Sequence, residues 1–433
     1  MANRRASILR TVFARAMQAL AMTPVITALF LGALVLAASV PNAPIVKHLA
    51  EDRALFAVER AYAATGRKID VGTECLGVSF GLAKANEEID ALARAIRAPV
   101  YLSCASLVAH LESTDTAGDL QSDYARYWHG YAAISRPMLA LLPYHDFRML
   151  YFNGVLALAF ALGFRLYRDF GLKFAVAVFL PFYFINYAGF LLLWTKAVTW
   201  IVALCAALYF ANARRPYERD PFLAFFVIGA FTAYLDWLTT PLFTFAFPAY
   251  IYFFYLYRRG GAPAPREAVV RLLLMGAFWA SGYALLLLAK FILATAVLGE
   301  GYWTDIIGSG LMRFRGAYES VKPWPGAAIL ENFEALKGFW GPLALIVFIA
   351  LPLARQSGRR AARELFTRTP VFALLAASPF VWYEILTNHS QIHATFTHAN
   401  LVLFLLPLSL VLFGESARFT GAGARSPGEG KKQ

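Results

Sequence analysis

Apolar segments of membrane-helix length alternate with polar connections from Met22 to Leu412. A hydrocarbon core about 30 Å thick needs roughly 20 apolar residues per helix, fewer where flanking side chains reach the interface. The pattern therefore predicts an all-α polytopic membrane protein with about ten transmembrane helices. The expected helices cover 23–41, 149–164, 174–189, 195–211, 221–235, 241–257, 272–298, 342–353, 371–386 and 401–412.

Two polar connections, 42–148 and 299–341, are long. The first is rich in acids and contains stretches with apolar residues three or four positions apart, which favours short helices. We expect a small helical extracytoplasmic cap that ends in a juxtamembrane helix. The expected parts are an N-terminus 1–22, a first transmembrane helix 23–41, the cap 42–148, a nine-helix domain 149–412 with the outer loop 299–341, and a disordered cytoplasmic tail 413–433.

Composition supports the membrane assignment. The 433 residues are 59% hydrophobic and 15% charged, with a mean hydropathy of +0.54. Soluble domains carry about 25% charged residues, so an ordinary soluble protein is excluded. The net charge of +13 would suit a nucleic-acid partner only if the basic side chains gathered on one soluble face. They lie between the apolar segments instead, and no nucleic-acid partner is expected.

The distribution of basic residues predicts the orientation. With the N-terminus in the cytoplasm, the inner connections collect most of the arginines, whereas the short outer connections near Phe190, Thr239 and Ser390 hold almost none. The positive-inside rule then places both termini in the cytoplasm. An alternative is that the first segment is a cleaved signal peptide, which would leave nine helices.

Ionisable and histidine side chains fall at one end of the expected helices. Such groups are costly in a membrane and are therefore functional candidates. A transporter or flippase is expected to carry them near the midplane, so the one-sided distribution predicts a site that faces the extracytoplasmic surface. These side chains are Arg148, Lys196, Asp236, Glu384, His389 and His393.

An aromatic and basic stretch, 122–142, precedes the second expected helix. It contains Tyr127, Trp128, His129 and Arg136. Because Trp and Tyr favour the headgroup level, one interpretation is a juxtamembrane helix that lies in the interface. A compatible interpretation is that the Arg136 guanidinium binds a lipid phosphate through paired hydrogen bonds.

Several of these residues have more than one interpretation. Asp236 is either a helix cap or partner of Lys196, or it binds substrate or metal. His389 and His393 are four positions apart and would share a helix face. A metal site would need a third ligand, so the alternatives are hydrogen bonds to a phosphate or sugar hydroxyl, or simple packing at the interface.

The expected cap holds two acidic groups and two cysteines. Asp70 and Glu74 flank Thr73, and a second acidic pair, residues 51 and 52, follows the first helix. The cysteines, at positions 75 and 104, show no metal-binding spacing. In an oxidising compartment they form either a disulfide or two packed thiols.

These features together resemble the C-type (GT-C) superfamily of polytopic membrane glycosyltransferases, and an uncharacterised bacterial group of that kind. The resemblance covers most of the chain: about ten helices, a long acidic first outer loop, an aromatic and basic stretch before the second helix, and polar groups gathered outside. The local strings that carry it are Asp70-x-x-Thr73-Glu74, Arg126-Tyr-Trp-His-Gly130, Arg136-Pro137, Asp236-x-Leu-Thr-Thr-Pro241 and Asn388-His-Ser-x-x-His393.

The resemblance implies an enzyme of the bacterial inner membrane that uses a polyprenyl-phosphate-linked sugar as donor and a glycan, lipid or protein of the cell envelope as acceptor. It implies a loop carboxylate as general base, for which Glu74 is preferred over Asp70. A divalent cation is an alternative aid to the departing phosphate. The residues expected to bind donor phosphate and lipid are Arg136, Lys196, His129, His389 and His393, and those expected to bind substrate are Asp236, Tyr127 and Trp128.

Two other classes of function compete with this hypothesis. One is a lipid-intermediate flippase or solute transporter, which a charge network at the midplane would favour. The other is a non-enzymatic membrane assembly protein, which dispersed outer polar residues would favour. Convergence of those residues on one place favours the glycosyltransferase.

Overall fold

The computed structural model describes residues 2–57, 71–79, 82, 90–100, 104–112, 122–185, 193–218, 220–259, 263–299, 301–314, 321–336, 343–344 and 346–420. Over these residues the regular secondary structure is helical apart from one short antiparallel ladder, in which β1 (Ala98–Val100) pairs with β2 (Ser122–Tyr124). Asp70, one of the expected catalytic residues, lies outside the described residues.

Several apolar helices are long enough to cross a membrane, as expected of an integral membrane protein. Among the described residues, five helices are clear candidates: α8 (Tyr144–Phe170), α11 (Trp194–Asn212), α15 (Pro265–Leu298), residues Leu9–Ala38 of α1 (Ala2–Ala38), and Ala394–Leu412, which comprises α23 (Ala394–Thr397), η3 (His398–Asn400) and α24 (Leu401–Leu412). A further candidate in the same ranges is the bent pair α20 (Gln356–Arg368) and α21 (Pro370–Ile385), which meet at an angle of 93°.

The other expected spans are also helical but are shorter or interrupted. At a rise of about 1.5 Å per residue, the 14-residue α13 is roughly 21 Å long, less than the apolar thickness of a bilayer. The count of ten spans therefore stays a prediction. These elements are α9 (Leu172–Phe184), α13 (Phe222–Leu235), α14 (Pro241–Arg258), and the pair η2 (Ile346–Ala350) and α19 (Leu351–Ala354).

Two glycines allow α13 and α15 to pack backbone against backbone. A Cβ atom on Gly229 of α13 would lie 2.0 Å from the carbonyl oxygen of Trp279 on α15. A Cβ atom on Gly282 of α15 would lie 2.1 Å from the carbonyl oxygen of Phe226 on α13. Small residues permit such close approach between apolar helices, so these positions fix the packing of this pair.

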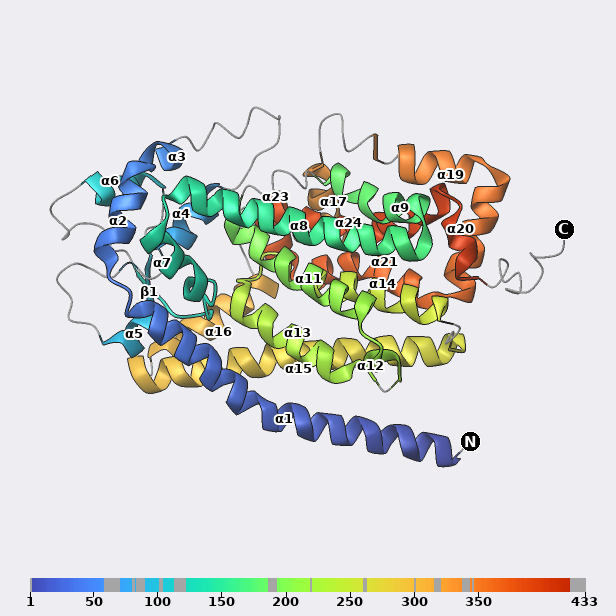
Figure 1. Ribbon diagram of the computed structural model, residues 1–433, viewed down its shortest axis with the longest axis horizontal. Coiled ribbons are helices and arrows are strands. Elements are labelled where there is room, and N and C mark those ends of the chain that lie inside the picture. Colours follow the sequence, from blue (N-terminus) through green and yellow to red (C-terminus); the bar gives the residue numbers. More distant parts are fainter. Residues whose placement is uncertain are drawn as a thin grey trace.

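Short elements gather at one end of the long axis of the molecule (Figure 1). A disulfide joins Cys75 of α4 to Cys104 of α6, with Cα atoms 5.1 Å apart, which confirms one of the two alternatives for these cysteines. The group comprises α2 (Asn42–Glu51), α3 (Arg53–Ala57), α4 (Val71–Ser79), α5 (Ala91–Ile96), α6 (Cys104–Glu112) and α7 (Ala132–Leu141), with β1 and β2.

Two expectations about chain ends and connections need correction. The expected juxtamembrane helix over 122–142 is helical only in α7, since residues 125–131 are irregular. In the expected disordered tail, Glu415–Arg418 form the short helix η4, and Phe419 packs against Phe174 and Phe254. Apolar contacts of this kind hold the start of the tail against the helices.

The remaining helices are α12 (Arg215–Glu218), α16 (Gly301–Phe314), α17 (Ala327–Glu334) and α22 (Thr387–Ile392).

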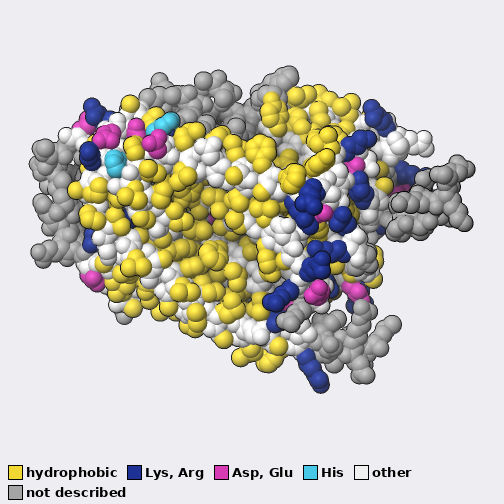
Figure 2. Space-filling model, viewed as in Figure 1, with side chains coloured by type: hydrophobic (Ala, Val, Ile, Leu, Met, Phe, Trp, Pro, Cys, Tyr) yellow, Lys and Arg dark blue, Asp and Glu magenta, His cyan; other side chains and the backbone are white. Residues whose placement is uncertain are grey.

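The surface divides along the same long axis. Figure 2 shows a broad apolar belt over the middle of the molecule, with charged side chains at its two ends. Lys and Arg gather at the end opposite to α2–α7, where α1 also begins (Figures 1 and 2). A belt of this kind between polar ends is typical of a protein that sits across a bilayer.

Candidate functional site

Glu74 connects α4 to the first turns of α8 and α11. Its Oε2 accepts a hydrogen bond from the Tyr144 hydroxyl, and its Oε1 accepts two from Thr195, from the hydroxyl at 2.9 Å and the backbone N–H at 3.1 Å. Arg148 Nε lies 3.8 Å from Oε2. Burial raises the pKa of Glu74, while Arg148 and these hydrogen bonds act in the opposite direction.

The first two turns of α11 link Glu74 to a second buried carboxylate. Thr195 bonds Glu74, Lys196 is the next residue, and the Thr199 hydroxyl donates to Asp236 Oδ1 at 2.9 Å. Residues four apart on a helix lie on the same face, so Thr195 and Thr199 present their hydroxyls along one side of α11. Both carboxylates and Lys196 are almost fully buried.

Asp236 shapes the turn between α13 and α14. It accepts hydrogen bonds from the backbone N–H groups of Leu238, at 3.0 Å, and Thr239, at 3.1 Å, and from the Thr239 hydroxyl. Leu238 has a φ of +72°, a left-handed conformation that is costly for a branched side chain. Burial raises the pKa of Asp236, and the hydrogen bonds and nearby Lys196 oppose that shift.

The strained turn points its backbone toward His389 of α22. The Leu238 carbonyl oxygen lies 2.8 Å from His389 Nε2, and because a carbonyl only accepts, Nε2 carries the proton. Burial, with the nearby His393 ring and the positive charge of Arg313, holds the pKa of His389 well below its usual range. His389 is therefore neutral at physiological pH.

Lys196 and the two histidines share one aromatic neighbour. The Lys196 Nζ lies 3.6 Å from the centre of the Phe396 ring, within the range of cation–π attraction. The His389 and His393 rings are 4.8 Å apart, and His393 stacks on Phe396 at 5.0 Å. We refer to Lys196, Asp236, His389, His393 and Phe396 as the Lys196 cluster.

Tyr127 reaches the edge of the Lys196 cluster. It is buried against Leu238 and Leu386, and the Arg313 guanidinium lies over its ring at 5.5 Å. Arg313 belongs to α16, which packs against α22. The cluster therefore draws on α11, the α13–α14 turn, α22 and α23, and the 125–131 stretch and α16 lie beside it.

Arg136 lies elsewhere and holds the end of α1. Its Nε donates to the Ala37 carbonyl at 2.9 Å, and its Nη2 donates to the Val40 carbonyl at 2.6 Å and to Asn42 Oδ1 at 3.0 Å. A cation that bonds the last carbonyls of a helix stabilises its C-terminus. Burial and the like charge of Arg94 lower the pKa of Arg136 to about 10.

The residues after Tyr127 are fixed by the neighbouring helices. Trp128 Nε1 donates to the Leu286 carbonyl of α15 at 2.7 Å. Gly130 N–H donates to the Tyr234 carbonyl at 2.7 Å, and a Cβ atom on Gly130 would lie 2.4 Å from the Tyr234 ring. His129 between them has a φ of +51°, and burial holds its pKa well below the usual range.

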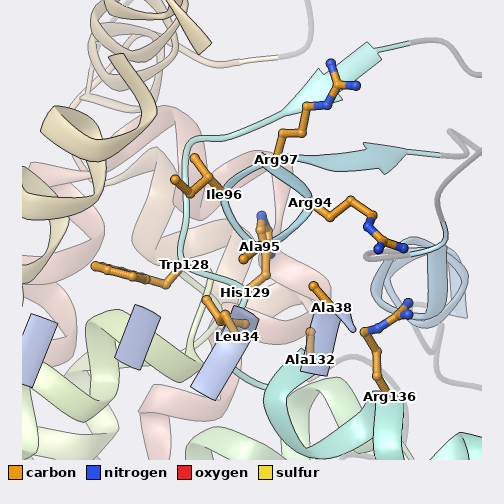
Figure 3. A pocket seen from close by; sticks show the side chains of 10 residues that line it. All are labelled: Leu34, Ala38, Arg94, Ala95, Ile96, Arg97, Trp128, His129, Ala132 and Arg136. Atoms are coloured by element: carbon orange, nitrogen blue, oxygen red, sulfur yellow. The ribbon is translucent and has the colours of Figure 1, made fainter. Parts of the chain in front are cut away.

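Trp128, His129 and Arg136 line a pocket between α1, α5 and α7 (Figure 3). We refer to it as the arginine pocket. Its cavity volume is about 20 Å³, room for about one water molecule, and the space around it opens to solvent. The other lining residues are Leu34, Ala38, Arg94, Ala95, Ile96, Arg97 and Ala132.

The expected site residues thus fall into three places. Lys196, Asp236, His389 and His393 come together in the Lys196 cluster, with Tyr127 at its edge, and Trp128, His129 and Arg136 line the arginine pocket. Glu74 lies beside the cluster, because it accepts a hydrogen bond from Thr195, the residue before Lys196 on α11. The alternative acids serve locally, because Asp52 accepts a hydrogen bond from the His145 N–H at 2.8 Å and Glu51 lies 3.9 Å from Lys47.

Sequence reasoning missed the hydroxyl groups that hold the carboxylates. Thr195, Thr199 and Tyr144 lie at ends of apolar helices, where their hydrogen bonds depend on tertiary contacts. A four-residue threonine spacing at the start of a span was the available signal. Arg94 was missed as well, because it lies in a short helix whose neighbours in space are distant in sequence.

Within the described ranges, no three His, Cys, Asp or Glu side chains gather as a metal ion would require. No family model, curated protein or solved structure matches the chain.

Proposed function

We propose that the protein is a membrane glycosyltransferase that moves a sugar from a polyprenyl-phosphate-linked donor to a glycan, lipid or protein acceptor of the cell envelope. The observation that carries the proposal is the meeting of Lys196, Asp236 and His389, which belong to separate helices and a turn. These residues lie at the end of the apolar helices where α4 is also found, because Thr195, next to Lys196, bonds Glu74 of α4. Polar groups at the helix ends favour chemistry at one face over alternating access.

Lys196 and the histidines are suited to the departing polyprenyl phosphate. As the sugar leaves, negative charge grows on the phosphate, and fixed donors in a water-poor site stabilise that charge strongly. Lys196 supplies a positive charge. His393, beside the same Phe396 ring, is a further donor to the phosphate or to a sugar hydroxyl.

The carboxylates take different parts in this proposal. Asp236 is a positioning residue, because its hydrogen bonds hold the Leu238 carbonyl against His389. The general base remains Glu74 or Asp70, as the resemblance implies. A base must come within about 3 Å of the acceptor hydroxyl. Glu74 would therefore exchange one of its bonds to Tyr144 or Thr195 for the acceptor.

The proposal includes ten transmembrane helices in the bacterial inner membrane, with both termini in the cytoplasm and α2–α7 as the extracytoplasmic cap. The basic end of the molecule supports this orientation (Figure 2). Reporter fusions after Arg214 and Arg360 are expected to report the cytoplasm, and a fusion after Lys47 the outside. A cytoplasmic signal at Lys47 would contradict the orientation and the position of the site.

Transfer in membranes that contain the full chain tests the activity directly. Radiolabelled polyprenyl-phosphate hexoses and pentoses are supplied, and label in envelope material is measured. Lys196→Met keeps the apolar stem on Phe396 but removes the charge, so transfer should fall about a hundredfold. Lys47→Met, on exposed α2, is the matched control and should transfer normally. Wild-type rates in correctly inserted Lys196→Met, or no transfer of any supplied sugar by the wild type, would overturn the proposal.

A further inference from the structure

Helix α20 lies across the basic end of the molecule. It meets the apolar helix α21 at an angle of 93°. Figure 1 shows α20 crossing the end of the long axis that lies opposite to α2–α7. A helix at a right angle to the apolar helices of a membrane protein runs in the plane of the bilayer surface. We therefore treat α20 as a surface helix of the membrane boundary.

One side of α20 is apolar and faces the protein. Ala362 and Leu365 are buried in the main core, and Phe366 packs against it. The neighbours of α20 include α21, α24 and η4. Arg368, at the last position of the helix, donates to the Thr420 carbonyl at 2.9 Å. These contacts fix the helix on the protein, so its opposite side has a defined direction.

The opposite side of α20 is exposed and rich in arginine. We refer to Arg355, Arg359, Arg360 and Arg363, all of them exposed, as the basic face of α20. Arg359 and Arg363 are four positions apart and share one side of the helix. Glu364 is the only acid in the sequence of α20, and it pairs with Arg360 at 2.9 Å. The face therefore has an excess of positive charge.

The basic face begins where the apolar surface ends. Leu351 and Leu353 of α19 are 46% and 37% exposed, and Arg355 follows directly after α19. Figure 2 shows Lys and Arg side chains beside the apolar belt at this end of the molecule. Because the belt lies against hydrocarbon, guanidinium groups at its border lie at the depth of the lipid headgroups. A guanidinium offers planar paired donors that match phosphate oxygens.

We propose that the basic face of α20 binds the headgroups of anionic phospholipids at the membrane surface. Clusters of basic side chains on a helix beside a membrane span attract negatively charged headgroups. Charge complementarity selects this partner, since a zwitterionic headgroup carries a cation that the guanidinium groups repel. The face lies at the end of the molecule opposite to α4 and the Lys196 cluster. The proposal therefore does not rest on sugar transfer.

The test is phospholipid binding by the purified full chain in neutral detergent micelles, measured by native mass spectrometry. Phosphatidylglycerol and phosphatidylcholine are titrated separately, and the wild type should prefer phosphatidylglycerol. The double variant Arg355→Gln/Arg363→Gln removes two charges and should weaken phosphatidylglycerol binding about tenfold or more. Glutamine resembles arginine in helix propensity. Within the described ranges neither arginine side chain makes a hydrogen bond or ion pair, so the variant should fold normally.

Two further variants separate the basic face from net charge. Lys47→Gln/Arg53→Gln removes two charges from exposed positions on α2 and α3, at the other end of the molecule, and is the matched control. It should bind phosphatidylglycerol as the wild type does. Arg355→Lys/Arg363→Lys keeps both charges and should retain most of the affinity.

Three results would overturn the proposal. The first is equal phosphatidylglycerol binding by wild type and Arg355→Gln/Arg363→Gln. The second is a wild type without preference for phosphatidylglycerol over phosphatidylcholine, which would leave an acidic protein as the partner that fits the face. The third is an equal loss in Lys47→Gln/Arg53→Gln, because net charge alone would then explain the binding. Since the assay contains no sugar donor, failure of sugar transfer does not affect its result.

Discussion

Glu74 of α4 caps the N-terminus of α11 through Thr195. One carboxylate oxygen accepts both the backbone N–H and the hydroxyl of Thr195, at 3.1 and 2.9 Å. The residue in the capping position of α11 is Leu193, which has no side-chain acceptor. A carboxylate at a helix N-terminus is stabilised by unpaired N–H groups and by the helix dipole. Glu74 therefore supplies from another helix what the local sequence lacks.

The Glu74→Gln variant separates this capping role from a role as general base. Loss of the charged acceptor should lower the free energy of unfolding by about 1–3 kcal/mol, measured by thermal unfolding in detergent. If Glu74 also takes the acceptor proton, transfer should fall on the order of a hundredfold or more. Tyr144→Phe removes one bond to the carboxylate but keeps its charge, and it is the matched control.

Comparison of the two variants decides between the roles. A base predicts that Glu74→Gln loses far more transfer than Tyr144→Phe at similar stability. Parallel losses in both variants would assign Glu74 to structure alone. The search for the base would then move to Asp70.

Acid should destabilise the protein through His389. Its folded pKa lies well below the unfolded value near 6.5, because burial disfavours the charged form. Between these two pKa values the unfolded chain binds more protons, so stability falls as the pH drops below about 6.5, by at most about 1.4 kcal/mol per pH unit for this group. Above pH 6.5 this group contributes no slope.

Thermal unfolding between pH 7.5 and 5 measures this effect. His389→Gln should reduce the acid slope, since its amide still donates to the Leu238 carbonyl but does not titrate. His145→Gln, at an exposed position, should keep the wild-type slope. An unchanged slope in His389→Gln would contradict a buried neutral imidazole. His129, which is also buried with a lowered pKa, should contribute a separate part of the slope.

The disulfide between Cys75 and Cys104 predicts a specific labelling result. In unfolded protein without reductant only Cys205 should react, and reductant should expose two more thiols. Equal labelling with and without reductant would show that the bridge is absent. Because the bridge ties Glu74 and its helix α4 to α6, its loss should lower stability by about 3 kcal/mol.

The sequence predicted individual helices better than their contacts. The expected spans 195–211 and 401–412 nearly coincide with α11 and α24, because an uninterrupted apolar run leaves few alternatives to a membrane helix. α1, by contrast, begins at Ala2 rather than at position 23, since a helix continues into polar residues that hydropathy does not mark.

The sequence predicted which types of residue form the site and at which end of the helices they lie, but not which residues they contact. The position of Lys196 and His389 at the same end of the helices followed from the span boundaries, and the structure brings them together. Arg136 was expected to meet a lipid phosphate, yet its described hydrogen bonds go to Ala37, Val40 and Asn42. These partners lie more than ninety residues away in the chain, so only the fold shows them.

The last prediction concerns the close packing of α13 against α15. Gly229→Ala and Gly282→Ala each place a Cβ atom about 2 Å from a backbone carbonyl oxygen of the facing helix, so the helices must separate. Backbone cannot move aside as a flexible side chain can, and each variant should lose about 1–3 kcal/mol of stability. Gly154→Ala on α8 is the matched control, because its Cβ would meet nothing within 4 Å. Replacing this helical glycine should be neutral or should stabilise by about 0.5–1 kcal/mol. Thermal unfolding of the three variants in detergent distinguishes the effects, and equal unfolding temperatures for Gly229→Ala and Gly154→Ala would contradict the close approach of α13 and α15.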